Sequence, residues 1–234
     1  LVFHSYEEVD YVRQRMDATL TKGLADHGMV VLGISDGGFA YIISEKPLRT
    51  LGDLKGQKVW TPEGDILTEA MFESAGISPI PLPVADVYTG LQTGLLDTVA
   101  GIPTGIIAFQ WYTSVTYLTD VPLMFLSGML TIDSKAFGRI KAGDQQIVRA
   151  IMGDIFSKLD EVNRADNESA RAALKNQGIE FVHPDAAERD NWESIAKQGR
   201  EQLISRAKYT PALVEEMLRH IQEYRSRHGS GDSE

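Results

Sequence analysis

The residue types that most often carry out catalysis or bind metals are present in this sequence but are not arranged for either task. There is no cysteine, which removes thiolate nucleophiles, disulfides and Cys-ligated zinc or iron–sulfur clusters. No nucleophile elbow, zinc-protease helix motif or phosphate-binding Walker loop occurs. No histidine lies within four residues of another, and we expect all five to be solvated surface side chains: His4, His27, His183, His220 and His228. The sequence therefore predicts no cofactor, no metal and no enzymatic activity.

Two further sets of residues also favour a structural interpretation. The carboxylate pairs Glu7-Glu8 and Glu215-Glu216 fall in helical patterns, where we expect them on solvated faces. The glycine-rich segment 33–38 lacks the spacing and the following helix of a dinucleotide-binding loop. We interpret it as a turn or hinge between two short strands.

Residues suited to binding a small molecule gather where a predicted strand ends at Trp60 and a helix begins near Asp65. Ligands of open α/β sheets bind at such carboxyl ends of strands. Aromatic rings at these positions more often fill a core, and acidic residues there often stabilise a helix N-terminus, so both alternatives stay open. The candidate ligand-binding residues are Trp60, Thr61, Glu63, Asp65, Tyr88, Gln92, Thr104, Phe109 and Trp111.

The elements that must position these residues follow from hydrophobic periodicity. Helices alternate with short apolar strands over residues 29–132, which predicts an α/β fold with a mainly parallel sheet. We expect the strands near 39–44, 58–60, 80–82 and 97–102 to share that sheet. Residues 144–177 contain no proline and carry apolar residues at helical spacing: Ile147, Ile151, Ile155, Leu159 and Val162. A continuous helix there would be about 50 Å long, which predicts a strut between two lobes.

Composition narrows the class of protein further. The chain has 234 residues, 43% of them hydrophobic, and a formal net charge of −10. The acidic balance argues against binding of nucleic acid, whose phosphates require a basic surface. No apolar run approaches the ~20 residues that a membrane-spanning helix needs.

One segment resembles a known family. Residues 86–97 read Asp-Val-Tyr-Thr-Gly-Leu-Gln-Thr-Gly-Leu-Leu-Asp, which is similar to the signature of TRAP transporter substrate-binding proteins. The runs at 51–58, 3–9 and 177–184 also resemble segments of that family, so the likeness covers most of the chain. The resemblance implies a periplasmic receptor that binds a small molecule between two α/β lobes and passes it to the membrane subunits of a TRAP transporter.

The resemblance also implies a division of the chain. Residues 1–36 and 126–165 would form the remainder of lobe I and the long interlobe helix, and residues 37–125 and 166–234 would form lobe II. The family segment that builds most of lobe I has no counterpart here, so the N-terminal lobe is expected to be incomplete. Exposed edges could then produce a homo-oligomer or a domain-swapped dimer. A self-associating interaction module and a small α/β enzyme without a recognisable motif remain the alternatives.

The sequence departs from the family at the positions that would hold a ligand carboxylate. The resemblance places family arginines at Trp60 and near Ala40, and no Arg or Lys occurs between Trp60 and Ser134. A buried carboxylate needs a compensating cation, and Lys58 would be the nearest one. We therefore expect a ligand more apolar or aromatic than the usual small carboxylates, with Trp60 stacking on it. The alternative is that the Trp60 ring fills the core of its own lobe.

Overall fold

The computed structural model describes residues 2–206 and 209–228, which form two compact units. Unit 1 contains Val2, residues 39–125 and the described part of 166–214; unit 2 contains residues 3–38, 126–165 and 215–228.

The strands are β1 (Met29–Ser44), β2 (Trp60–Pro62), β3 (Ile80–Leu82), β4 (Thr98–Gly101), β5 (Tyr117–Asp133) and β6 (Glu180–Val182). The helices are α1 (Tyr6–Asp26), α2 (Ile66–Ser74), α3 (Val87–Gln92), α4 (Pro103–Ala108), α5 (Ser134–Phe137), α6 (Ala142–Asn176), α7 (Ala186–Ser205) and α8 (Pro211–His228).

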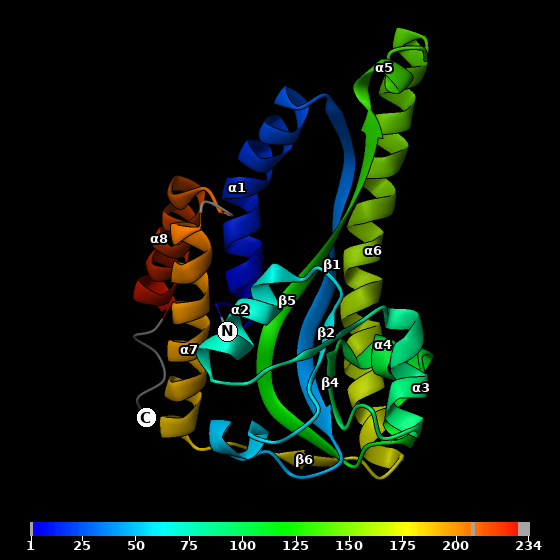
Figure 1. Ribbon diagram of the computed structural model, residues 1–234. Coiled ribbons are helices and arrows are strands. Elements are labelled where there is room, and N and C mark those ends of the chain that lie inside the picture. The colour runs from blue at the N-terminus through cyan, green and yellow to red at the C-terminus, as the bar shows by residue number, and fades with distance from the viewer. Residues whose placement is uncertain (1, 207–208, 229–234) are drawn as a thin grey trace. The chain divides into compact units, whose positions relative to one another are not determined.

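The strands form two sheets where the sequence predicted one. A four-stranded sheet has the order β4-β1-β5-β6, and β2 pairs with β3 in a separate two-stranded sheet (Figure 1). An isolated bridge between Val59 and Thr98 links a residue next to β2 with β4. The larger sheet is mixed rather than mainly parallel: β1 runs antiparallel to β4, and β5 and β6 are parallel. Hydrogen bonds from Thr116 to Ser44 and from Ser134 to Gly28 join the opposite ends of β1 and β5, so these two strands are also antiparallel. The small sheet of β2 and β3 is parallel, as predicted.

The segment 33–38 is not a turn: it lies inside β1, a single strand of 16 residues. Glycine is required at position 33 because the Phe156 ring occupies the space of a side chain. A Cβ built on Gly33 would lie 2.2 Å from that ring. Gly33 therefore serves close packing within unit 2 rather than marking a break in the strand.

Strand β5 was not predicted from the sequence, although it is the longest strand at 17 residues. Pro122 and Gly128 interrupt its pattern, and only its first part alternates between buried and partly exposed side chains. β1 and β5 each contribute residues to both units, so they are the shared elements of the larger sheet.

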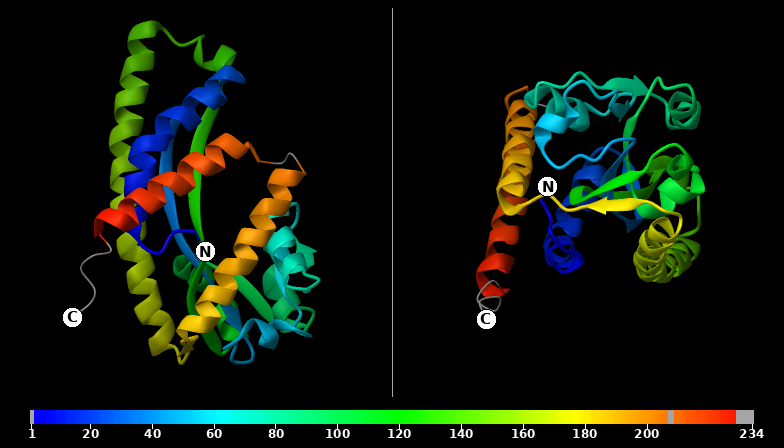
Figure 2. Two further views of the ribbon diagram at one scale, coloured as in Figure 1. Left: turned by 90° about the vertical axis from the view of Figure 1, so that its left-hand side faces the viewer. Right: turned by 90° about the horizontal axis from the view of Figure 1, so that it is seen from below.

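Unit 1 has a hydrophobic core on both faces of its sheet. Ile42 and Ile43 are neighbours in β1 and point to opposite faces, and each belongs to a different buried cluster. One cluster gathers around Trp60, Trp111 and Leu174, and the other gathers around Met71 and Trp192. Helix α7 packs on α2 in the second cluster, where Gly199 lets the two helices approach closely (Figure 2).

Helix α6 confirms the predicted long helix, with 35 residues and a length of about 50 Å. Its apolar stripe, however, is not a packed face in unit 2. Ile147, Ile151, Ile155 and Val162 are 43–57% exposed. The α6 side chains that are partly buried there, Met152 and Phe156 among them, lie on a neighbouring face of the helix.

Two other predictions of solvated residues were wrong, both where α1 and α8 meet in unit 2. Glu8 is buried because Arg225 of α8 donates two hydrogen bonds to its carboxylate, at 2.6 and 3.0 Å. His220 is buried at the edge of the Tyr11 ring, with Glu223 3.2 Å from its Nδ1. These contacts explain why residues 215–228 belong to unit 2, whereas the sequence-based division placed 166–234 in lobe II. The predicted flexible tail at 229–234 lies outside the described residues.

Candidate functional site

The predicted binding residues after β2 have clear structural roles. Asp65 is the N-cap of α2: its carboxylate accepts hydrogen bonds from the backbone N–H groups of Leu67 and Thr68, both at 3.1 Å, and from the Thr68 hydroxyl at 2.6 Å. Glu63 is exposed in the preceding turn. Thr61 is fully buried, and its hydroxyl has no hydrogen-bond partner in the described part of the chain. Among these three residues, Thr61 is the one whose polar atom is buried without a hydrogen-bond partner in the described part of the chain.

Trp60 lies in the core of unit 1, which is the alternative that the sequence analysis left open. Its side chain is 5% exposed, and its indole Nε1 donates a hydrogen bond to the Leu82 carbonyl at 2.9 Å. The Trp111 ring packs edge-on against it at a centroid distance of 5.4 Å. The ring therefore fills apolar volume and leaves almost no free face for stacking on a ligand.

A second aromatic pair extends from this core to the surface of unit 1. The Phe109 ring stacks on Trp111 at 5.4 Å and is 50% exposed, whereas Trp111 is 3% exposed. Between them, Gln110 adopts a left-handed backbone conformation with φ of 57°. This turn lets one ring point inward and the other outward. The Trp111 Nε1 is buried without a hydrogen-bond partner among the described residues, so a donor and an exposed ring lie in adjacent side chains.

Helix α3 presents Tyr88 and Gln92, two of the candidate ligand-binding residues, to solvent. Tyr88 is 40% exposed, and Gln92 is exposed and bonds to the Ser114 hydroxyl at 2.5 Å. The buried face of α3 carries Val87 and Leu91 instead. Because Tyr88 and Gln92 each follow those residues by one position, they are rotated about 100° away from the core.

Thr104 is held by the portion of α6 that belongs to unit 1. Its backbone N–H and its hydroxyl both donate to Oδ1 of Asn167, at 3.3 and 3.1 Å. Asn167 is 5% exposed, so this contact is a buried tie between α4 and α6. Thr104 thus has a structural partner within its own unit.

Sequence reasoning missed Arg171, which lies one helical turn beyond Asn167 in α6. Its guanidinium lies over the rings of Tyr41 and Phe181, at 4.6 and 5.0 Å, and donates to Asp120 at 2.9 Å. Burial raises the pKa of the Tyr41 hydroxyl beside it. Since β1, β5 and β6 supply these partners, no spacing in the sequence could have brought them together.

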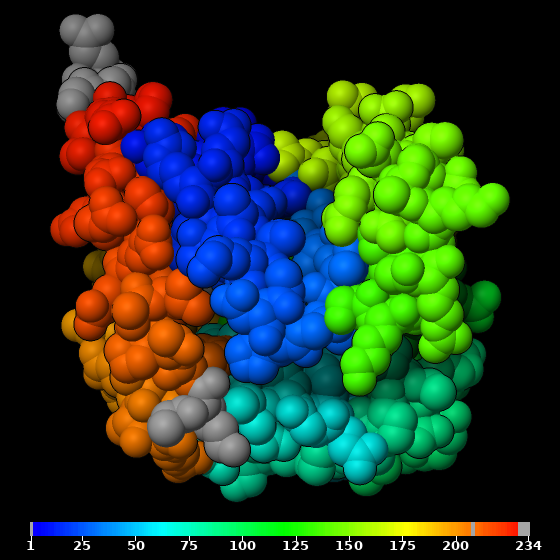
Figure 3. All heavy atoms as spheres, turned by 90° about the horizontal axis from the view of Figure 1, so that it is seen from above, coloured from blue at the N-terminus to red at the C-terminus, as the bar shows by residue number. Residues whose placement is uncertain are grey.

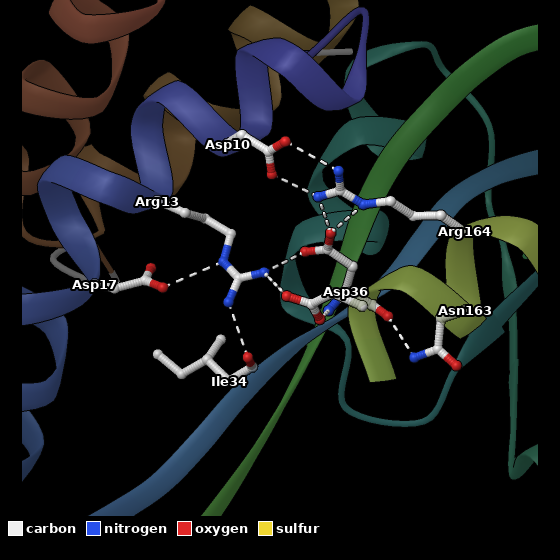
Figure 4. Close-up of polar contacts among 8 residues, drawn as sticks. Asp10, Arg13, Asp17, Ile34, Asp36, Asn163 and Arg164 are labelled. Carbon is white, nitrogen blue, oxygen red and sulfur yellow. Dashed lines mark hydrogen bonds and ion pairs between the residues drawn. The ribbon is translucent and has the colours of Figure 1, made fainter. Parts of the chain in front are cut away.

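The charged cluster of unit 2 is built around Asp36, which is fully buried in β1 (Figure 4). Arg13 of α1 donates to it at 2.6 Å, and Arg164 of α6 donates to it at 2.8 Å. Arg13 also bonds to Asp160 at 2.9 Å, and Arg164 bonds to both carboxylate oxygens of Asp10.

Both arginines are thus saturated by protein acceptors, which are carboxylates and, for Arg13, also the Ile34 carbonyl. Burial acts to lower the pKa of Arg13, but the neighbouring carboxylates outweigh it, and carboxylates also raise the pKa of Arg164. The pKa of Asp17, beside Arg13, is raised mainly by burial. The cluster ties α1, β1 and α6 together within unit 2 and leaves neither arginine open to an external anion.

The described residues contain no group of three or more His, Cys, Asp or Glu that could hold a metal ion. None of the helices in that part of the chain has the length and apolar character needed to cross a bilayer.

The candidate binding site of unit 1 is the exposed Phe109 ring, which stacks on the buried Trp111 near the β2 segment that carries Thr61. Such groups can bind an organic molecule without altering it.

Comparison with known proteins agrees with a binding role. Residues 1–206 match the family described as bacterial extracellular solute-binding protein, family 7. A C4-dicarboxylate-binding periplasmic protein of Rhodobacter capsulatus is 23% identical over 88% of this chain and 62% of its own length. A 2,3-diketo-L-gulonate-binding periplasmic protein of Escherichia coli is 24% identical over 76% of this chain and 54% of its own. The chain therefore spans little more than half the length of these relatives.

Solved structures share the fold. A TRAP periplasmic solute binding protein from Xanthobacter autotrophicus, with bound β-D-galacturonate, superposes with a TM-score of 0.85 at 21% identity, covering 95% of this chain and 72% of that one. One from Shewanella oneidensis, with bound succinate, gives 0.86 at 18% identity over 94% and 72%. The two-lobed periplasmic-binding-protein architecture expected from the sequence is thereby confirmed as the fold class.

Proposed function

Because this chain belongs to the bacterial extracellular solute-binding proteins of family 7, a periplasmic family of receptors rather than enzymes, we propose that it binds a small organic solute and delivers it to a TRAP-type transporter. The observation that carries this proposal is the family match over residues 1–206, together with the fold shared with TRAP solute-binding proteins. The relatives named above are receptors for small organic acids. The sequence also lacks the nucleophile and metal-binding motifs named above, which fits a protein that binds a small molecule without converting it.

The test of the receptor role is native mass spectrometry of protein purified from its own host, followed by thermal shift with the solute released from it. A bound small molecule that raises the melting temperature and is recovered unchanged would support the proposal. Chemical conversion of that molecule would contradict it. A preparation that never carries a solute and shows no thermal shift with any small organic compound would also contradict it.

We further propose that the ligand is more apolar or aromatic than those of the relatives. Three observations support this idea: no Arg or Lys occurs in 61–134, the Lys58 amine donates to the Gly94 carbonyl, and Arg171 pairs with Asp120 through Nη2 while its Nη1 is buried. A carboxylate bound against unit 1 would therefore have few cations available. Phe109 replaces Trp60 as the expected stacking residue, since its ring is half exposed.

A calorimetric screen of small organic acids and of aromatic or lipid-like solutes tests this finer proposal. Phe109→Ala should weaken binding of an apolar solute about fivefold or more, by removing one stacking face worth ~1 kcal/mol. Leu95→Ala, which changes a side chain of unit 1 that is 49% exposed and is not among the candidate ligand-binding residues, is the matched control and should bind normally. Micromolar binding of a dicarboxylate that is undiminished in Phe109→Ala would refute the apolar ligand while leaving the receptor role intact.

A further inference from the structure

Helix α4 of unit 1 receives the cap of its first turn from another helix. Ile102 is its N-cap residue and has no polar side-chain group that could accept a hydrogen bond. The first N–H groups of a helix need acceptors from outside its own ladder. Oδ1 of Asn167 in α6 accepts from the Thr104 backbone N–H at 3.3 Å and from the Thr104 hydroxyl at 3.1 Å. Asn167, 63 residues further along the chain, therefore takes the place of a local cap.

The other end of α4 leads directly to the exposed ring of the candidate binding site. Phe109 is the C-cap residue of α4, and its N–H donates to the Gly105 carbonyl at 2.9 Å. Its ring stacks on Trp111, and Figure 3 shows atoms of this part of unit 1, coloured cyan to green, at the molecular surface. With six residues, α4 is only about 9 Å long. A tilt at its first turn would therefore move the Phe109 ring at its end.

The contact between α4 and α6 is buried in the core of unit 1. Asn167 is 5% exposed, so water competes little for its Oδ1. One further turn along the same helix, Leu174 belongs to the buried cluster that also holds Ile106 of α4 and Trp111. A helix of six residues is not stable by itself in water. The orientation of α4 is therefore set by its neighbours, through the apolar packing of Ile106 and the hydrogen bonds to Asn167.

We propose that Asn167 is a positioning residue for solute binding, which holds α4 so that the Phe109 ring meets the solute. This inference rests on the proposed receptor function and on Phe109 as the stacking residue. Asn167 acts through α4 and does not itself touch the solute. A binding group must be held within about 0.5 Å and 10–20° of its productive placement by the residues that support it. Loss of the Asn167 acceptor should therefore weaken binding more than loss of an equally buried hydrogen bond elsewhere in unit 1.

The test is titration calorimetry with the solute released from protein purified from its own host. Asn167→Ala should bind that solute about fivefold more weakly, as expected for Phe109→Ala. Asn167→Asp keeps an oxygen acceptor at the same place and should bind nearly as the wild type does. The matched control is Thr119→Val, which removes the 3.2 Å hydrogen bond from a buried threonine hydroxyl of unit 1 to the Leu48 carbonyl. It should lower the melting temperature without changing the affinity.

The double variant N167A/F109A separates positioning from general stability. If Asn167 acts through Phe109, the double variant should bind no more weakly than Phe109→Ala alone, whereas independent effects would multiply to about 25-fold. Thr104→Val removes one of the two hydrogen bonds, and should weaken binding about twofold even if Asn167→Ala does not fold. Tryptophan fluorescence and far-ultraviolet circular dichroism establish that each variant is folded.

Three results would overturn the inference while leaving the receptor role intact. They are normal binding by folded Asn167 and Thr104 variants, multiplicative effects in the double variant, and an equal loss of affinity in Thr119→Val. Normal binding by Phe109→Ala would also overturn it, because Asn167 would then have no stacking residue to position. Absence of any bound solute in protein from the host would contradict the receptor role and this inference together.

Discussion

The two units of this protein are stabilised by different means. In unit 1, two apolar clusters cover opposite faces of the sheet, and polar contacts such as the Asp65 cap occur at element ends. In the described part of unit 2, the buried apolar side chains are few: Val9, Val12, Met16, Phe137 and Ile221. Its elements are joined instead by the Asp36 cluster and by the Glu8–Arg225 pair. Unit 2 also exposes the apolar stripe of α6.

The difference teaches that one continuous helix can serve two kinds of packing. Within unit 1, α6 contributes the fully buried Leu174, while within unit 2 it contributes Arg164 to a charge network and leaves Ile151 exposed. Buried apolar area stabilises without regard to direction, whereas buried ion pairs require every partner to be in place. Unit 2 should therefore be more sensitive to the loss of a single charge and to pH than unit 1.

The largest effect is expected from Asp36→Ala, which leaves two arginines of unit 2 without their shared carboxylate. Breaking a buried ion pair should cost about 3–5 kcal/mol in the stability of unit 2. All three tryptophans, at 60, 111 and 192, lie in unit 1, so their fluorescence reports on that unit alone. Hydrogen exchange should therefore show loss of protection in α1 while the fluorescence transition changes little.

The control for that experiment is Asp17→Ala, because Asp17 is 33% exposed and bonds to Arg13 only at the edge of the cluster, at 3.2 Å. It should cost less than about 1 kcal/mol. If Asp36→Ala and Asp17→Ala cost the same, charge pairing does not hold unit 2 together.

A comparison within α6 should give the next largest effect. Leu174→Ala removes a side chain with no exposed surface from the core of unit 1 and should cost about 2–5 kcal/mol, detected by tryptophan fluorescence in a denaturant titration. Ile151→Ala changes the same helix where the side chain is 53% exposed and should stay within about 0.5 kcal/mol of the wild type. A large cost at Ile151 would mean that its face is packed in solution.

The pH dependence of unit 2 should follow Glu8. Burial acts to raise the pKa of Glu8, but the hydrogen bonds from Arg225 and from the His4 backbone N–H outweigh it, so its pKa is lowered from the ordinary value of 4.5. A carboxyl group whose pKa is lowered by folding stabilises the folded state at pH values above its ordinary pKa. That stabilisation is lost as the pH falls through the lowered pKa of the folded state.

We therefore expect Glu8→Gln to reduce protection of α1 and α8 by about 1–2 kcal/mol at pH 7 and to have progressively less effect below pH 4.5. The measurement is hydrogen exchange as a function of pH. A cost that does not change across this range would assign the contact to packing rather than to charge.

The smallest effect is expected at the N-cap of α2 in unit 1. Asp65→Ala removes the acceptor for two backbone N–H groups and should cost about 1 kcal/mol, while Asp65→Asn should preserve most of the cap. Tryptophan fluorescence in urea checks both variants. Equal losses would show that the charge of Asp65 rather than its capping bonds stabilises the helix.

Local chemistry was sufficient to predict the elements whose signals lie within a few residues. The end of α1 at His27-Gly28, the glycine after α2 at position 76 and the start of α8 at Pro211 all follow from capping and backbone preferences. The long α6 followed from an uninterrupted helical pattern, and residues 86–97 indicated the family. In these cases the deciding interactions are between neighbours in the chain.

Only the tertiary structure decided which faces are buried and which charges are paired. Trp60 lies in the core because Trp111 and Leu82, far along the chain, surround it, and Tyr88 is exposed because Val87 takes the buried side of α3. The glycines of β1 predicted a turn, but Gly33 lies inside the strand because the Phe156 ring occupies the space of its side chain. Burial is a property of a residue's surroundings in space, and a periodic sequence pattern identifies an apolar face without identifying what covers it.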